Sequence, residues 1–257
     1  MPRPYGPLGL LASLVALAVL ALLYTLAPLA LAALAAVIAF GLAGAAKASS
    51  AVLLVMRRGD DASLTILFGL GILVYAATLA ALYTLARWRA GADWRELVAW
   101  RPWSPRRAGW RFWALVGAGM VYGALAGAAV GWLHPNMNAL VKFPQTPLGL
   151  TVSFALAVLA APLAEEALFR GWIFTSLRAR FSFWLTNIVC AAAFAIAHWD
   201  PTHLYSLAIF PLGLMLGLAR ERSGSIRASA TFHALYNCFA FALVVFAART
   251  GAPRPAS

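Results

Sequence analysis

Acidic residues are scarce in this chain, and so is charge of any kind. Asp and Glu together number 8 in 257 residues, charged residues make up 11% of the chain, and hydrophobic residues make up 63%. Ordinary soluble domains are about 45–50% apolar, so this composition excludes a soluble globular protein. Several apolar runs approach or exceed the roughly 20 residues that cross a bilayer. The sequence therefore predicts one polytopic membrane domain with no soluble domain beside it.

Cysteine is equally scarce. Cys190 and Cys238 both lie in apolar runs, without the spacing of metal ligands, and we interpret them as small buried hydrophobes. A His-Glu-x-x-His motif is also absent, and no internal repeat is visible. The missing repeat counts against a transporter built from inverted halves.

Apolar segments make up most of the chain, and we predict an all-α bundle of about eight transmembrane helices. The first run begins at Leu8 and passes almost directly into a second, so we expect a retained helix rather than a cleaved signal peptide. The segment 148–178 would be roughly 45 Å long as a helix, too long for a simple span, and Pro162 is expected to kink it. The predicted segments are 8–25, 28–46, 63–86, 112–133, 148–178, 183–199, 203–220 and 226–247.

The net charge of +12 comes almost entirely from arginine. The stretch 87–111 interleaves seven arginines with five tryptophans, which is typical of a surface helix at the lipid headgroups. Nucleic-acid binding is a poorer interpretation, because the stretch is short and flanked by spans. With the predicted spans, the arginine-rich connections 87–111, 178–180 and 220–227 fall on one side, which the positive-inside rule makes cytoplasmic. Lys47, Arg57 and Arg58 and the C-terminal arginines conflict with that orientation.

Glu165 and Glu166 lie side by side in the apolar segment 148–178, and Arg170 follows them. One carboxylate at bilayer depth costs about 2.5 kcal/mol or more unless it is paired or wetted, so two adjacent ones indicate chemistry. Arg170 is four residues after Glu166, a spacing that lets the side chains meet and keeps Glu166 ionised. Glu165 points about 100° away from Glu166 and is free to face something else.

Two further polar motifs follow in later apolar segments. His198 follows Phe194 by four residues, and Asn237 follows His233 by four, so each pair shares a helix face. Glu165 and His198 fall at a similar depth, about 22 Å from the same side. A carboxylate and an imidazole can deprotonate a water, and a second imidazole with a carboxamide can donate hydrogen bonds to a developing oxyanion. Together these groups supply what amide hydrolysis requires.

These motifs resemble those of the CPBP intramembrane proteases, also called the CAAX protease and bacteriocin-processing (Abi) family. The resemblance covers roughly residues 148–240, while the N-terminal half is similar only in being hydrophobic. The segment 222–226 and two glycines of the preceding helix, Gly213 and Gly217, also resemble the family. The motifs Glu-Glu-x-x-x-Arg, Phe-x-x-x-His and His-x-x-x-Asn are matched in this order by Glu165, Glu166 and Arg170, by Phe194 and His198, and by His233 and Asn237.

The resemblance implies roles for six of these residues. Glu165 and His198 are expected to activate water, and His233 and Asn237 to form the oxyanion site. Glu166 and Arg170 are expected to support the first pair. On this basis we assign residues 148–247 to the catalytic core and 1–147 to N-terminal transmembrane helices that include the interfacial connection 87–111.

Metal dependence stays open at this point. One carboxylate and two histidines also form a familiar catalytic zinc set, with Glu165, His198 and His233 as the alternative ligands. We favour the version without a metal or other cofactor. The second histidine is paired with Asn237 on one helix face, and that pair suits two hydrogen-bond donors better than one ligand and a bystander.

Other interpretations of the same residues remain. Carboxylates and histidines at bilayer depth also mark proton relays in transporters, and a non-catalytic immunity-type membrane protein would keep the fold. Glu166 and Arg170 can be a structural ion pair, and His233 and Asn237 can join helices. The expected partners are the lipid bilayer and a membrane-associated protein or peptide substrate, not nucleic acid. The Ala, Leu and Arg bias favours a bacterial plasma membrane.

Overall fold

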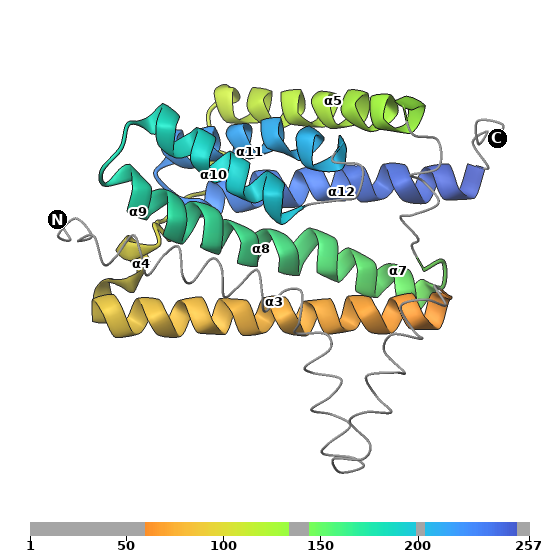
Figure 1. Ribbon diagram of the computed structural model, residues 1–257, viewed down its shortest axis with the longest axis horizontal. Helices are drawn as coiled ribbons and strands as arrows, with labels where there is room; N and C mark the ends of the chain where they lie inside the picture. The colour runs from red at the N-terminus through yellow and green to blue at the C-terminus, as the bar shows by residue number, and fades with distance from the viewer. Residues whose placement is uncertain (1–59, 134–143, 199–203, 251–257) are drawn as a thin grey trace, which may run out of the picture.

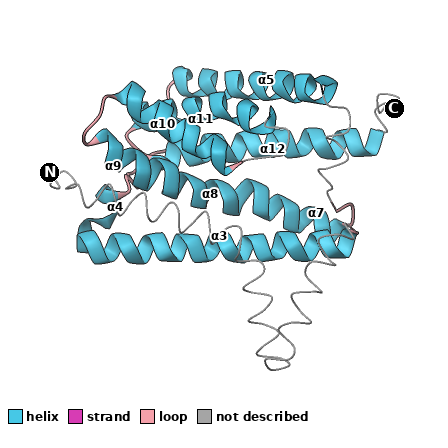
Figure 2. Cartoon of the chain, in the orientation of Figure 1, coloured by secondary structure: helices cyan, strands magenta, loops and turns pink. Residues whose placement is uncertain are grey.

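The computed structural model describes residues 60–133, 144–198 and 204–250, and all of its long elements are helices (Figures 1 and 2). Among these residues there is no strand. The predicted segments 8–25 and 28–46 lie outside the described residues. The other predicted segments coincide with helices, so the all-α bundle is confirmed, whereas the number of eight spans stays a prediction.

The main helices lie along one direction (Figure 1). Helix α3 packs against the long helix 147–178, and α12 lies between that helix and the pair α5 and α11. Helix 147–178 consists of five consecutive pieces. The helix bounds are α3 Asp61–Ala90, η1 Gly91–Asp93, α4 Trp94–Leu97, η2 Pro105–Arg107, α5 Trp110–Leu133, α7 Pro147–Phe154, η3 Ala155–Ala160, α8 Ala161–Glu166, η4 Ala167–Ile173, α9 Phe174–Arg178, α10 Phe183–Ala197, α11 Leu204–Ser223 and α12 Ile226–Thr250.

Five of the described helical stretches are long and apolar enough to cross a bilayer. Helix α10 is apolar but shorter, with 15 residues. Helices of this length and composition place the chain among integral, multi-pass membrane proteins. The qualifying stretches are Asp61–Leu97, Trp110–Leu133, Pro147–Arg178, Leu204–Ser223 and Ile226–Thr250.

Short polar side chains fix where the helices begin. Asp60 accepts a hydrogen bond from the Ser63 amide at the start of α3, and Ser182 caps α10 in the same way. Asp61 accepts hydrogen bonds from the backbone amides of Gln145 and Thr146. The start of α3 is therefore tied to the start of helix 147–178, which lets the two helices run side by side.

The expected distortion around Pro162 takes the form of π-helical turns. The π-helical segment η3 ends at Ala160, two residues before Pro162, and a second one, η4, follows directly after Glu166. A wider turn before a proline relieves the clash between its ring and the carbonyl four residues back. The short helix α8, which carries both glutamates, is thus held between two π-helical segments.

Helices α10 and α11 approach each other closely through the two glycines of the small-residue pattern. A Cβ atom on Gly213 would lie 3.0 Å from the Ala191 Cα, and one on Gly217 would overlap Asn187 Oδ1. Both positions therefore require glycine for this packing distance. The close approach also brings the Gly213 carbonyl within reach of Arg170.

The stretch 87–111 is not the single surface helix that its composition predicted. Gly91 at φ 55° ends α3, and short helices and extended residues follow as far as Trp110. The physical reason is a small apolar anchor: Leu97, Val98 and Ala99 are buried, and the first two pack with Trp172. This anchor interrupts the arginine and tryptophan pattern.

The arginine-rich connections do gather at one end of the bundle, as expected (Figure 1). The Ile226 amide donates to the Ala99 carbonyl at 3.0 Å, and the Ser225 hydroxyl donates to the Arg101 carbonyl at 2.8 Å. Arg178 forms an ion pair with Glu221 at 3.0 Å. These contacts join the connections 87–111, 178–180 and 220–227. The cytoplasmic location of this end stays a prediction.

Candidate active site

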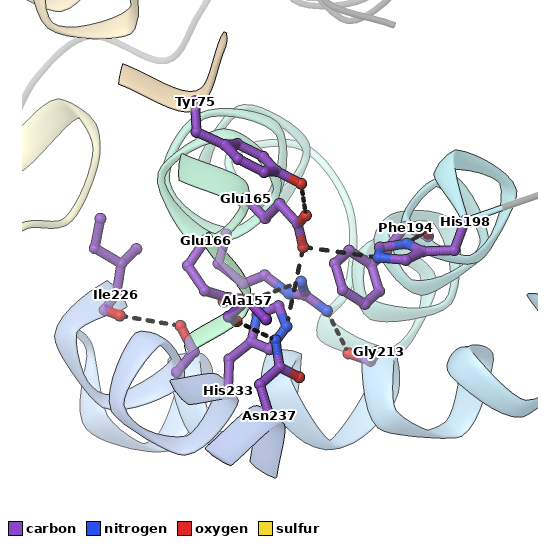
Figure 3. Close-up of polar contacts among 12 residues, drawn as sticks. Tyr75, Ala157, Glu165, Glu166, Phe194, His198, Gly213, Ile226, His233 and Asn237 are labelled. Carbon is purple, nitrogen blue, oxygen red and sulfur yellow. Dashed lines mark hydrogen bonds and ion pairs between the residues drawn. The ribbon is translucent and has the colours of Figure 1, made fainter. Parts of the chain in front are cut away.

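The two adjacent glutamates face different surroundings (Figure 3). Glu166 and Arg170 form an ion pair at 2.8 Å, and both side chains have no exposed surface. The Arg170 guanidinium also donates to the Gly213 carbonyl at 2.9 Å and lies 4.5 Å from the ring centre of Phe194. The predicted i, i+4 pair is therefore present, and it joins helix 147–178 to α10 and α11.

Glu165 lies on the other side of α8, with 11% of its side chain exposed. Its Oε2 atom is 3.8 Å from His198 Nε2 and 3.9 Å from His233 Nε2. Its Oε1 atom accepts a hydrogen bond from the Tyr75 hydroxyl. One carboxylate oxygen is thus held, while the other faces two imidazole rings.

His198 lies where α10 ends, with φ −101° and ψ 30°. Its Nδ1 atom is 2.8 Å from the Phe194 carbonyl oxygen. A carbonyl oxygen only accepts, so we assign the proton of a neutral ring to Nδ1. The Nε2 atom then presents a lone pair toward Glu165, at a separation too long for a direct hydrogen bond.

His233 and Asn237 project from α12 toward the same cluster (Figure 3). His233 is almost completely buried, and its Nδ1 atom is 3.3 Å from Glu166 Oε1. The Asn237 amide donates to the Ala157 carbonyl of η3 at 2.8 Å. Each of the two α12 side chains therefore has a contact that fixes its orientation.

The structure brings Glu165, His198 and His233 together and places the ion pair behind them. One detail differs from the expected arrangement. Glu166 contacts His233 rather than His198, and Arg170 reaches His198 only through Phe194, whose ring centre is 4.6 Å from the His198 ring. The ion pair therefore supports His233 of α12 directly and His198 of α10 only through Phe194.

Tyr75 also belongs to the cluster, although its role was not predicted from the sequence. It lies in α3, in the half of the chain that was described only as hydrophobic, and it is 8% exposed. A signal was available, because Tyr75 is near the middle of the apolar segment 63–86. A hydroxyl near the middle of a span needs a hydrogen-bond partner, and Glu165 is at comparable depth.

The predicted alternative zinc ligands have suitable donor atoms. In the described part of the chain, however, no three His, Cys, Asp or Glu side chains are arranged so that they could hold a metal ion. Zinc ligands lie about 2.0–2.2 Å from the ion. Glu165, His198 and His233 would have to close around a common point to reach that geometry.

Comparisons with known proteins identify the region that holds this cluster. Residues 147–239 match the family model described as type II CAAX prenyl endopeptidase, Rce1-like. An uncharacterized 24.3 kDa protein of Escherichia coli is 35% identical over 95 residues, which cover 36% of this chain and 42% of that relative. The chain thus spans less than half of the curated relative that it matches. No solved structure matches the chain.

The family match confirms the resemblance to the CPBP proteases over residues 147–239. All six site residues that were predicted from the sequence lie inside this region. Tyr75 lies outside it, so the site includes a contact from a part of the chain that the family match does not cover.

Proposed function

We propose that this chain, whose residues 147–239 form an Rce1-like domain, is an intramembrane endopeptidase that hydrolyses peptide bonds of a membrane-associated protein or peptide. One observation carries the proposal: a single carboxylate oxygen of Glu165 faces two imidazole nitrogens at 3.8 and 3.9 Å. The family description supports peptidase chemistry in general. The geometry supports the roles that we propose for individual residues.

Glu165 and His198 activate the attacking water in this mechanism. The gap of 3.8 Å between Glu165 Oε2 and His198 Nε2 is longer than a hydrogen bond, and a water can bridge such a gap. Oε2 takes one proton of the water while the oxygen attacks the peptide carbonyl carbon, and Nε2 accepts the hydrogen bond of the other proton. When the carbon–nitrogen bond breaks, the protonated Glu165 returns its proton to the leaving amine.

Tyr75 holds the other oxygen of the same carboxylate. Its hydroxyl donates to Glu165 Oε1, so Oε2 is the oxygen that remains to act as the base. A fixed carboxylate has less freedom to lose when it aligns with water, which favours reaction. Tyr75 is therefore a positioning residue in this mechanism.

His233 and Asn237 stabilise the oxyanion that forms on the carbonyl oxygen. The Asn237 amide has two N–H groups, and one is used on the Ala157 carbonyl, which leaves the second for the oxyanion. His233 donates from Nε2 only if its ring also carries that proton while Nδ1 donates to Glu166. Such donors act strongly in a dry, low-dielectric site.

We propose that no metal takes part. The arrangement of donor groups within the described residues supports this, because no three His, Cys, Asp or Glu side chains there are arranged to hold a metal ion. A zinc-dependent form of the same protease is the alternative, with Glu165, His198 and His233 as ligands. Chelation and zinc analysis of the active protein separate the two.

The remaining assignments belong to the same proposal. We place the enzyme in a bacterial plasma membrane, with residues 148–247 as the catalytic core and residues 1–147 as supporting helices. The substrate is a membrane-associated protein or peptide, because the site lies between apolar helices rather than in a soluble domain.

The test uses the purified full chain in lipid nanodiscs with fluorogenic peptides tethered to the bilayer. Glu165→Gln keeps the size of the side chain but cannot take the proton of water. We expect turnover to fall by about 10²–10⁴-fold, the typical contribution of a general base. Glu96→Gln is the matched control, because it neutralises an exposed carboxylate that pairs with Arg101 far from the site. Cleavage by the Glu165 variant at the wild-type rate would exclude the mechanism.

A further inference from the structure

A second feature that the protease proposal does not use lies at the arginine-rich end of the bundle. A hollow of about 540 Å³ opens between the start of α5 and the end of α11. Its charged lining is Arg107, Arg111 and Arg222, and Trp103 and Trp110 lie beside them. We call this hollow the arginine pocket.

The charge of the arginine pocket is of one sign. Its lining includes no acidic residue. At the same end, Glu96 pairs with Arg101 and Glu221 pairs with Arg178. Among residues 60–133, 144–198 and 204–250, no ion pair involves Arg107, Arg111 or Arg222. Three guanidinium groups that share a concave surface without a carboxylate favour an anion.

The backbone adds to the same charge. Helix α5 begins at Trp110, on the wall of the pocket, and the amide groups of its first turn carry partial positive charge. Arginine matches phosphate oxygens in two parallel hydrogen bonds, which makes phosphate the anion best suited to this lining.

The wall of the arginine pocket is apolar on its inner side. Phe112, Leu115 and Ala219 line it, and the rings of Trp103 and Phe112 are 5.0 Å apart. Along α5 the side chains of Trp110 and Trp113 are 74% and 44% exposed. Tryptophan at the end of an apolar helix is typical of the membrane–water interface. A ligand that matches both parts of this lining would carry a phosphate at one end and hydrocarbon at the other.

We propose that the arginine pocket binds a phosphate group, and that its source is the headgroup of an anionic phospholipid. A free phosphate ion has the same charge but cannot use the apolar wall. Lipid attraction to basic residues near a membrane is common for whole surfaces. The present site is a discrete one, defined by three arginines that line a single hollow.

The experiment measures lipids retained by the full chain in native mass spectrometry, with phosphatidylglycerol, phosphatidylcholine or inorganic phosphate added. The test variant changes Arg107, Arg111 and Arg222 to Gln. The matched control changes Arg89, Arg95 and Arg106 to Gln, which removes the same charge from exposed positions in 87–111 outside the pocket lining. We expect the test variant to bind phosphatidylglycerol roughly tenfold more weakly or worse, and the control to bind within about threefold of wild type.

Each outcome decides the proposal. Selective loss of phosphatidylglycerol in the test variant supports it, particularly if the three arginines replaced by Lys restore most of the binding. Equal loss in test and control variants means a general surface attraction and overturns a discrete site, as does no loss in either. Inorganic phosphate that binds as tightly through the same arginines overturns the lipid source. If the triple variant fails to fold, the exposed single change Arg222→Gln provides the same comparison.

Discussion

The two sides of helix α8 differ more than their neighbouring glutamates suggest. On one side Glu166 is fully buried and contacts Arg170 and His233 through one oxygen. On the other side Glu165 is partly exposed, and one of its oxygens faces two histidines without a direct hydrogen bond. A rotation of about 100° along the helix thus separates a closed, paired carboxylate from one that is open to a reactant. In the proposed mechanism the closed side supports the site and the open side carries the chemistry.

The largest expected effect is on the closed side, and Arg170→Ala tests it. The change leaves the buried Glu166 carboxylate without its cation, which typically costs about 3–5 kcal/mol of folding free energy. Thermal unfolding in detergent measures the loss, and we expect peptidase activity to fall with it.

Arg178→Ala is the control for that change, because its ion pair with Glu221 is partly exposed, at 41% and 30%. A surface pair contributes about 0–1 kcal/mol. If the two variants unfold at the same temperature, the ion pair with Glu166 is incidental and the contrast between the two sides of α8 fails.

Asn237→Ala tests the oxyanion side of the site. Loss of one oxyanion donor typically lowers kcat by about 10²–10³-fold. We expect KM to change little, because the donor is used mainly in the transition state. Asn237→Asp is the matched variant, since it keeps the shape but replaces the N–H donors with acceptors, and it should not restore the rate. A rise in KM at constant kcat would instead assign Asn237 to substrate binding.

Much of this arrangement could be predicted from the sequence. The apolar segments gave the helices, and the i, i+4 spacings gave the Glu166–Arg170 pair, because helix periodicity is local and regular. The contact between Glu166 and His233 could not be predicted, because it depends on how α12 packs against α8. The prediction of a single surface helix over 87–111 was wrong for the same reason, because packing of Leu97 and Val98 against Trp172 overrides the surface-helix pattern.

Tyr75→Phe has a smaller expected effect and sharpens the contrast on the open side. The change removes the hydroxyl that holds Glu165 Oε1 and leaves the ring in place. We expect kcat to fall about tenfold, corresponding to about 1.4 kcal/mol, with KM unchanged.

Tyr83→Phe is the control in the same helix, because that tyrosine is 51% exposed and packs on Trp94. A merely structural role of Tyr75 would lower the thermal midpoint and leave the kcat of the folded fraction unchanged. That result would remove Tyr75 from the mechanism.

The smallest expected effect is that of metal removal, for which we predict no change. Strong chelators should leave the peptidase rate of the purified chain unaltered, and elemental analysis of active protein should find zinc well below one ion per chain. The physical reason is that in the proposed mechanism Glu165 deprotonates the water while His233 and Asn237 stabilise the oxyanion, so the reaction needs no metal ion. Stoichiometric zinc, with activity lost on its removal and regained on its return, would make Glu165, His198 and His233 ligands. The base would then have to be Glu166, whose contacts with Arg170 and His233 on the closed side of α8 would first have to break.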